Sequence, residues 1–402
     1  MLLAGQIGFN SCRQSLACPC QKGKILSLAA GLACGSRPIP GRELHEKRNH
    51  ALIMNQAVPP IGHATVPALG PPMGGLSPWG VGRRLLRISP REVTTERRRF
   101  CVDEPQKKHR IELIGSSFLQ GYHFALESAT LVSLTHQLAG TPLEYQGFAY
   151  EGAAMAIALL DRLLPWRSAQ LPPFLATDDN VYPYLTHVGV GWAMARIPGA
   201  MARLANTLAS ENQCVHDPQA PMSVLACLAL DGYGFHQAYF AWEKFVKAMV
   251  EPSFLTAAAL PVFRQGVGRS LVFVLGMSAL RIPACIARFP SSCQGDLWSG
   301  VGLAAAYAGG WTSQELQALL ESAGAHRPDL AQGVAFAVKA RQRAHVVPAH
   351  THLACERVWQ QPVGQVAQLC DTTLAELPSM PLLTAYALWR QRIQDAYAAS
   401  HP

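Results

Sequence analysis

The sequence lacks long apolar runs and carries little charge. Of its 402 residues, 15% are charged and 49% are apolar types. The longest apolar stretches, residues 153–160 and 271–280, are far shorter than the roughly 18 apolar residues of a membrane-spanning helix. We therefore expect a globular protein with no transmembrane segment.

Motifs for nucleotide binding and for hydrolysis are also missing. The sequence contains no G-x-x-x-x-G-K-[ST], no G-x-G-x-x-G that follows a strand, and no G-x-S-x-G. Metal-capable side chains come close together in one segment, at His345, His350, His352, Cys355 and Glu356, but neither C-x-x-C nor H-E-x-x-H is present. The sequence therefore predicts no cofactor and no metal.

The cysteines form no disulfide framework. Four of the 11 lie within the first 34 residues, and the others are scattered singly through apolar segments. Cys227, Cys285 and Cys370 stand among aliphatic residues, as small core residues do. This usage favours a reducing compartment, and we expect the protein to be cytoplasmic.

Basic side chains are concentrated in residues 83–110. Ten cations and four acidic residues there account for +6 of the formal net charge of +8. A nucleic-acid reader usually combines such a block with aromatic side chains or a helix-turn-helix, and neither accompanies it. We expect a solvated helix face or a surface for an acidic protein partner, and no nucleic acid.

Residues 1–80 differ from the rest of the chain. They mix Gly, Pro, Cys and isolated apolar runs without the periodicity of a helix or a strand. We expect residues 1–80 to be a disordered or mis-annotated N-terminal extension and residues 81–398 to form the folded domain.

From residue 111 onward the apolar residues follow a helical period, with almost no alternating strand pattern. Thr312 and Glu315 have the spacing of a capping box, and Asp371 is expected to be the N-cap of another helix. The sequence therefore predicts an all-α domain.

A glycine-centred motif recurs along this helical region. Its glycines stand at positions 121, 152, 189, 232, 266, 300 and 333. Their separations of 31 to 43 residues are typical of one helix-turn-helix unit. We predict tandem helical repeats, either an α-solenoid or a toroid-like α/α array, in which each glycine allows close helix contact. Polar residues that precede several of these glycines, such as Glu151 and Asp231, would then line one rim of the array.

Four side chains are the candidates for proton transfer: Glu151, His187, Asp231 and His236. His236 shares one helical face with Tyr233, and a histidine titrates near neutral pH. The alternative for His236 is a buried structural histidine. A carboxylate near a helix start, as at Glu151, is also favourable with the helix dipole alone.

Several long segments resemble one bacterial family. They begin at Arg83 (RRLLRISP), Gly147 (GFAYEGAAM), His187 (HVGVGWA), Leu230 (LDGYGFH), Gln265 (QGVGRSL), Asp296 (DLWSGVGL) and Leu330 (LAQGVAFAVKAR). The chain from about Arg83 to about Gln394 resembles the uncharacterised family whose members accompany enediyne polyketide synthases. The resemblance implies an accessory protein of enediyne or related specialised-metabolite biosynthesis, and no catalytic residue is carried over with it.

Two functions remain open, and with them whether the protein is an enzyme. In the first, it transforms or shelters an apolar polyene intermediate enclosed between its helices. The expected binding residues are His123, Tyr150, Trp192, Tyr233, Arg269 and Trp298. In the second, it is a non-catalytic α-solenoid that binds the polyketide synthase or another pathway protein.

Overall fold

The computed structural model describes residues 86–166, 168–176, 181–210, 214–215 and 223–401. The expected extension over residues 1–80 lies outside the described residues. Within the described residues the fold is all-α, as predicted, with one isolated β-bridge between Cys214 and Pro381.

The helices have the following bounds. They are η1 (Pro90–Val93), α3 (Thr95–Arg98), α4 (Pro105–Glu127), α5 (Leu131–Ala139), α6 (Leu143–Leu163), α7 (Leu171–Ala176), α8 (Pro183–Met194), α9 (Ala200–Leu208), η2 (Val224–Cys227), α10 (Leu228–Phe240), η3 (Glu243–Lys247), α11 (Leu260–Val274), α12 (Arg281–Ile286), α13 (Ser291–Ala308), α14 (Ser313–Ala323), η4 (Gly324–His326), α15 (Arg327–Arg343), α16 (Ala349–Trp359), α17 (Val363–Ala375) and α18 (Leu382–Ser400).

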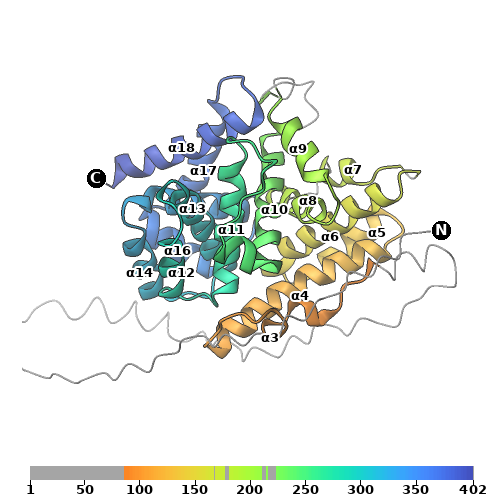
Figure 1. Ribbon diagram of the computed structural model, residues 1–402, viewed down its shortest axis with the longest axis horizontal. Coiled ribbons are helices and arrows are strands. Elements are labelled where there is room, and N and C mark those ends of the chain that lie inside the picture. The colour runs from red at the N-terminus through yellow and green to blue at the C-terminus, as the bar shows by residue number, and fades with distance from the viewer. Residues whose placement is uncertain (1–85, 167, 177–180, 211–213, 216–222, 402) are drawn as a thin grey trace, which may run out of the picture. The chain divides into compact units, whose positions relative to one another are not determined.

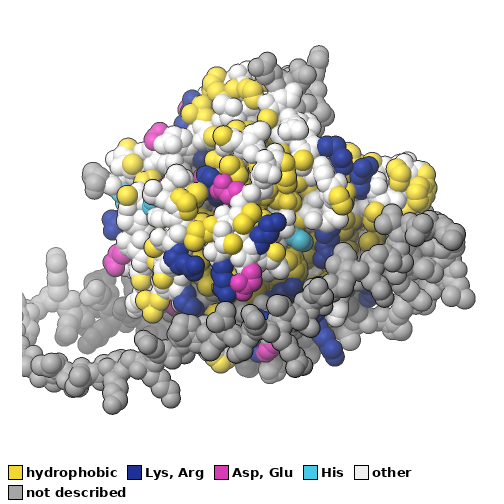
Figure 2. Space-filling view, viewed as in Figure 1, with side chains coloured by type: hydrophobic (Ala, Val, Ile, Leu, Met, Phe, Trp, Pro, Cys, Tyr) yellow, Lys and Arg dark blue, Asp and Glu magenta, His cyan; other side chains and the backbone are white. Residues whose placement is uncertain are grey.

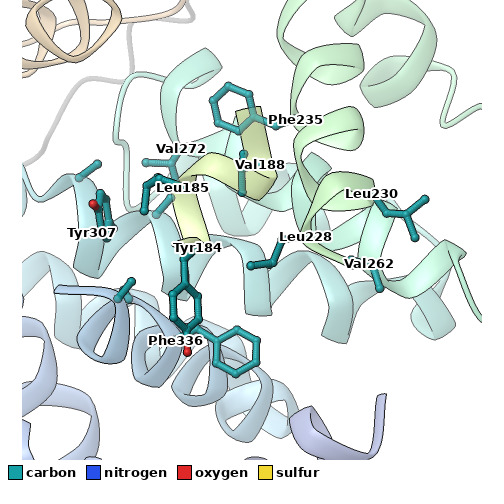
Figure 3. Close-up of a cluster of buried hydrophobic side chains, with 14 of the residues drawn as sticks. Tyr184, Leu185, Val188, Leu228, Leu230, Phe235, Val262, Val272, Tyr307 and Phe336 are labelled. Atoms are coloured by element: carbon teal, nitrogen blue, oxygen red, sulfur yellow. The ribbon is translucent and has the colours of Figure 1, made fainter. Parts of the chain in front are cut away.

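One row of helices forms the body of the domain. Along the chain, α4, α6, α8, α10, α11, α13 and α15 each pack against the next, and α15 also packs against α16, α17 and α18. Figure 1 shows the helices succeeding one another in chain order, from orange α4 to blue α18. Their buried apolar side chains meet in a common core, part of which Figure 3 shows for α8, α10, α11, α13 and α15.

Paired glycines bring these helices into backbone contact. A β-carbon at Gly266 of α11 would overlap the Asp231 carbonyl oxygen of α10, and one at Gly268 would overlap the Leu297 carbonyl oxygen of α13. The first glycine of each G-x-G pair therefore faces the preceding helix and the second faces the following helix. The same arrangement recurs at residues 189 and 191, 232 and 234, and 300 and 302.

The register predicted for the first repeat is corrected by two residues. A β-carbon at Gly121 of α4 would overlap the Ala149 carbonyl oxygen of the following helix, so Gly121 corresponds to the second glycine of a pair. Gly152 of α6 meets the Phe118 carbonyl oxygen, which gives Leu119 the place of the first glycine. The glycine pattern alone could not reveal this, because α4 keeps only one of the two glycines.

The row of helices curves, so its two ends share contacts. Arg341 of α15 donates to the Glu144 carbonyl oxygen of α6 at 2.8 Å and to the Tyr307 carbonyl oxygen of α13 at 2.6 Å. Arg110 of α4 binds the Glu144 carboxylate at 2.5 Å and also donates to the Ala308 carbonyl oxygen. These contacts join the first two helices of the row to its last two.

One predicted cap is present and the other is not. Thr312 and Glu315 form the capping box of α14. Asp371 is not an N-cap, because α17 begins eight residues earlier at Val363 and includes it. The Asp371 carboxylate instead accepts from Lys339 at 2.5 Å, so an ion pair accounts for its position.

Candidate functional site

A pocket opens between α4, α6, α8, α10 and α11 and is covered by Ile88, Glu92 and Val93. About 700 Å³ of unfilled space lies between these residues, and this value includes the space open to solvent at the pocket mouth. Its apolar lining consists of Ile111, Ile114, Phe118, Leu119, Phe148, Met155, Trp192, Phe235, Tyr239, Phe240 and Phe273. A concave apolar site with a few convergent polar groups is the usual form of a small-molecule site.

Two residues of α4 hold the covering segment over the pocket. The Ile88 amide donates to His123 Nε2 at 3.3 Å, and the Tyr122 hydroxyl donates to the Leu86 carbonyl oxygen at 2.8 Å. Burial lowers the pKa of His123 to about 4, so its ring is neutral at pH 7 and can accept this bond. The structure thus places His123, a predicted binding residue, in α4 against the segment that covers the pocket and not in the pocket lining.

Glu151 of α6 is the buried carboxyl group of the pocket. It lines the pocket with only 3% of its surface exposed. Burial raises its pKa to about 7, although the Arg269 charge opposes that shift. A carboxyl group with this pKa is present in both protonation states near neutral pH, so it can donate or accept a proton.

Arg269 of α11 supplies the positive charge beside Glu151. It lines the pocket at 5% exposure, and its guanidinium lies 5.2 Å from the centre of the Phe235 ring. Asp231 of α10, which is fully buried, forms an ion pair with it. Among the described residues, the Arg269 Nε–H has no hydrogen-bond partner. This arrangement leaves one fixed N–H donor of Arg269 without a protein acceptor.

Asp231 begins a buried hydrogen-bonded row that crosses the helices. Gln265 Nε2 donates to Asp231 at 2.8 Å, and the Ser299 hydroxyl donates to Gln332 Oε1 at 2.6 Å and lies 3.2 Å from Gln265 Oε1. Arg390 Nε donates to Gln332 at 3.0 Å. Asp231, Gln265, Ser299 and Gln332 each precede a repeat glycine, so they occupy equivalent places, but all four are completely buried and do not form a rim.

The remaining predicted site residues lie outside the pocket lining. His187 Nδ1 is 2.7 Å from the Pro183 carbonyl oxygen in its own helix. Tyr150 packs against Tyr182 at 4.7 Å between ring centres. Gln237 donates to the Tyr233 hydroxyl at 2.8 Å, and Trp298 is buried in α13 at 3% exposure.

His236 lies behind the pocket wall. Its ring centre is 5.4 Å from that of Trp192 and 4.6 Å from that of Phe240, two residues that line the pocket. Burial lowers the pKa of His236 to about 3, with a further contribution from Arg196. The ring is therefore neutral at pH 7.

The structure brings together Glu151, Trp192, Arg269 and Asp231 from the predicted set. Sequence reasoning missed Glu92 and Arg196, the other charged residues of the lining. Glu92 comes from a short segment outside the repeats, and Arg196 follows the end of α8, so neither shares the repeat pattern. Residues 87–90 belong to a motif that carries the family resemblance, and nothing in them indicates a covering element.

The histidines near the C-terminus do not converge. His350 Nδ1 is 3.3 Å from Arg110, and its Nε2 is 3.1 Å from the Tyr307 carbonyl oxygen. The Cys355 thiol donates to the Gln361 carbonyl oxygen at 3.4 Å. Within the described part of the chain, no group of three or more His, Cys, Asp or Glu side chains could hold a metal ion.

Ion pairs neutralise much of the basic block. Its cations bind acidic side chains in the pairs Arg87–Glu127, Arg97–Glu92, Arg98–Glu92, Lys107–Glu315, Lys108–Glu96 and Arg110–Glu144. On the face shown in Figure 2, the described Lys and Arg side chains are dispersed among apolar and acidic ones.

The comparisons with known proteins identify a family and no function. Residues 79–397 match the model of the family described as "Protein of unknown function (DUF1702)". Neither a curated protein nor a solved structure matches the chain. Among the described residues, the longest apolar helices fall short of what is needed to cross a membrane.

Proposed function

The chain belongs to the DUF1702 family, and we propose that it binds an apolar small molecule in the pocket and moves a proton on it through Glu151. The molecule is an intermediate of enediyne or related polyketide biosynthesis, with a polyketide synthase as the partner that supplies it. The pathway rests on the resemblance of the sequence motifs, and the chemistry rests on the pocket.

The single observation that supports proton transfer is the state of Glu151. A carboxyl group in an apolar pocket, with a pKa of about 7, is suited to general acid–base catalysis at neutral pH. The aromatic walls from Phe118, Trp192 and Phe235 are apolar and suit a flat conjugated ligand.

Arg269 defines the reaction class. Its guanidinium is held by Asp231, and its Nε–H has no acceptor among the described residues. Such a donor would stabilise negative charge that develops on a ligand carbonyl oxygen when a base removes a proton from a conjugated carbon. Glu151 would take that proton, exchange it with solvent, and give a proton to another carbon, so that a double bond moves without any co-reactant.

The experiment uses the full chain purified from a host that expresses the partner synthase. Native mass spectrometry detects a retained molecule, and incubation in D₂O tests whether that molecule gains deuterium. The proposal predicts a bound apolar molecule that gains deuterium in the wild type but not in Glu151→Gln. Glu321→Gln is the control, because Glu321 is exposed on α14, away from the pocket.

Two results would count against the proposal. A protein that co-purifies with the synthase but holds no small molecule favours the non-catalytic scaffold. A retained molecule that gains deuterium equally in wild type and Glu151→Gln leaves a binding protein whose Glu151 does not transfer protons.

A further inference from the structure

We propose that the ligand of this pocket carries an anionic group at one end, and that Arg196 and Arg98 bind this group at the pocket mouth. This inference rests on the proposed function, since it assumes that the pocket holds an apolar molecule. The substrate class is therefore a single apolar chain that ends in a carboxylate or a phosphate.

The exposure of the polar lining residues shows where the pocket opens. Glu151 and Arg269 are buried at 3% and 5% exposure, Glu92 is half-buried, and Arg196 is exposed. The mouth therefore lies near Glu92 and Arg196, and Glu151 lies at the inner end. A chain that enters at the mouth would reach Glu151 with its apolar part.

The mouth has an excess of positive charge. The Glu92 carboxylate is shared between Arg97, at 3.2 Å, and Arg98. Arg98 also donates to the Glu92 carbonyl oxygen at 2.8 Å, and its guanidinium lies 4.5 Å from the centre of the Phe240 ring. Within the described part of the chain, Arg196 forms no ion pair, so its charge adds to those of the two arginines that share the Glu92 carboxylate.

Arg196 and Arg98 belong to the same pocket: Arg196 lines it, and the Arg98 guanidinium lies over the ring of Phe240, which also lines it. Burial lowers the pKa of Arg98, and the Arg196 charge lowers it further. Two neighbouring guanidinium groups repel each other, and an anion bound between them would be attracted to both and would offset that repulsion. The fixed Arg98 and the exposed Arg196 would thus form the two sides of an anion site, directly above the apolar walls.

The test measures the affinity of the full-length protein for cis-parinaric acid, a fluorescent polyene carboxylate, and for its uncharged methyl ester. We expect the wild type to bind the acid about tenfold more tightly than the ester, and less so at high salt. Arg196→Gln should weaken binding of the acid about tenfold and leave the ester unchanged. Arg203→Gln, an exposed arginine on the neighbouring α9, is the matched control and should change neither.

Two results would overturn the proposed anionic end of the ligand but not the apolar pocket. These are equal binding of acid and ester by the wild type, and equal weakening of both by Arg196→Gln. Failure to bind either molecule overturns the proposed function as well. Competition by dodecyl phosphate, dodecanoate and dodecanol then separates the two head groups, because a phosphate site favours the first and a carboxylate site favours the second.

Discussion

Glu151 and Asp231 occupy the same position in two repeats, yet their surroundings differ. Both precede a repeat glycine, both are buried, and both lie beside Arg269. Asp231 has Arg269 and Gln265 as hydrogen-bonding partners. Glu151 faces an apolar pocket, and burial raises its pKa to about 7.

In our proposal, this difference separates a structural carboxylate, Asp231, from a reactive one, Glu151. A buried carboxylate that is fully hydrogen-bonded joins helices, whereas one beside an apolar cavity keeps a proton that it can give away. The repeat places a carboxylate at the same position in both helices, and the side chains packed around it determine whether it is hydrogen-bonded or faces the pocket. Five predictions can break or sharpen this comparison, beginning with the largest effect.

Asp231→Ala should lower the free energy of unfolding by about 3–5 kcal/mol, because it leaves the Arg269 charge buried without its carboxylate. Urea unfolding followed by circular dichroism measures the loss. Asp371→Ala is the control: the Asp371 side chain in its ion pair with Lys339 is half-exposed, so the loss should be smaller, about 1 kcal/mol. Equal losses in the two variants would show that Asp231 is not a structural centre.

Glu151→Gln, in contrast to Asp231→Ala, should stabilise the folded protein at high pH. The folded-state pKa of about 7 lies above the ordinary 4.5, so the stability that Glu151 contributes falls as the pH rises from 4.5 to 7. At pH 8 the variant should therefore be more stable than the wild type, by up to about 3 kcal/mol. Urea unfolding at pH 5 and pH 8 measures this, and a variant that is less stable at both values contradicts it.

Gly266→Ala tests the close helix contact that positions Asp231. A β-carbon there would overlap the Asp231 carbonyl oxygen, so the backbones must separate, at a cost of about 1–3 kcal/mol. Gly364→Ala is the matched control in α17, where a β-carbon meets no atom within 4 Å. It should be neutral or stabilising by up to about 1 kcal/mol. Thermal unfolding compares the two, and similar melting temperatures would argue against backbone contact.

Tyr122→Phe tests the segment that covers Glu151. It removes the hydrogen bond to the Leu86 carbonyl oxygen, worth about 1 kcal/mol. Amide exchange should become faster over residues 86–93 and stay unchanged in α13. Unchanged exchange over residues 86–93 would mean that the covering segment does not depend on Tyr122.

Arg196→Gln should have the smallest effect on folding, below about 0.5 kcal/mol, because the side chain is exposed and forms no ion pair among the described residues. Its expected effect is on binding of the carboxylate alone. A large loss of stability, measured by thermal unfolding, would give Arg196 a structural role.

The sequence predicted the all-α fold and much of the repeat, because the glycines at helix contacts recur at regular spacing. The prediction was wrong where one of these glycines is missing: α4 has Leu119 in place of the first glycine, so the predicted register there was off by two residues. It also placed the polar residues on a rim, because periodicity reveals which positions are equivalent but not whether they face inward or outward. Their burial depends on how closely the next helix approaches.

The candidate site was only partly predictable for the same reason. Glu151, Trp192 and Arg269 were found because they belong to repeat motifs that share one face of the array. His236 and Tyr233 belong to the same motif as Asp231 but lie outside the pocket lining, since successive helical positions point in different directions. The packing of η1 against α4, which brings Glu92 over the pocket, is a property of the tertiary structure, so no local sequence pattern predicts it.

The most direct test of the central claim is a ¹³C NMR titration of the Glu δ-carbons, with Glu151→Gln used to assign the Glu151 signal. A signal that is absent in the variant and titrates with a midpoint near 7 is the expected result, given the buried carboxyl group. A midpoint near the ordinary 4.5 would contradict it and would make Glu151 a structural carboxylate like Asp231.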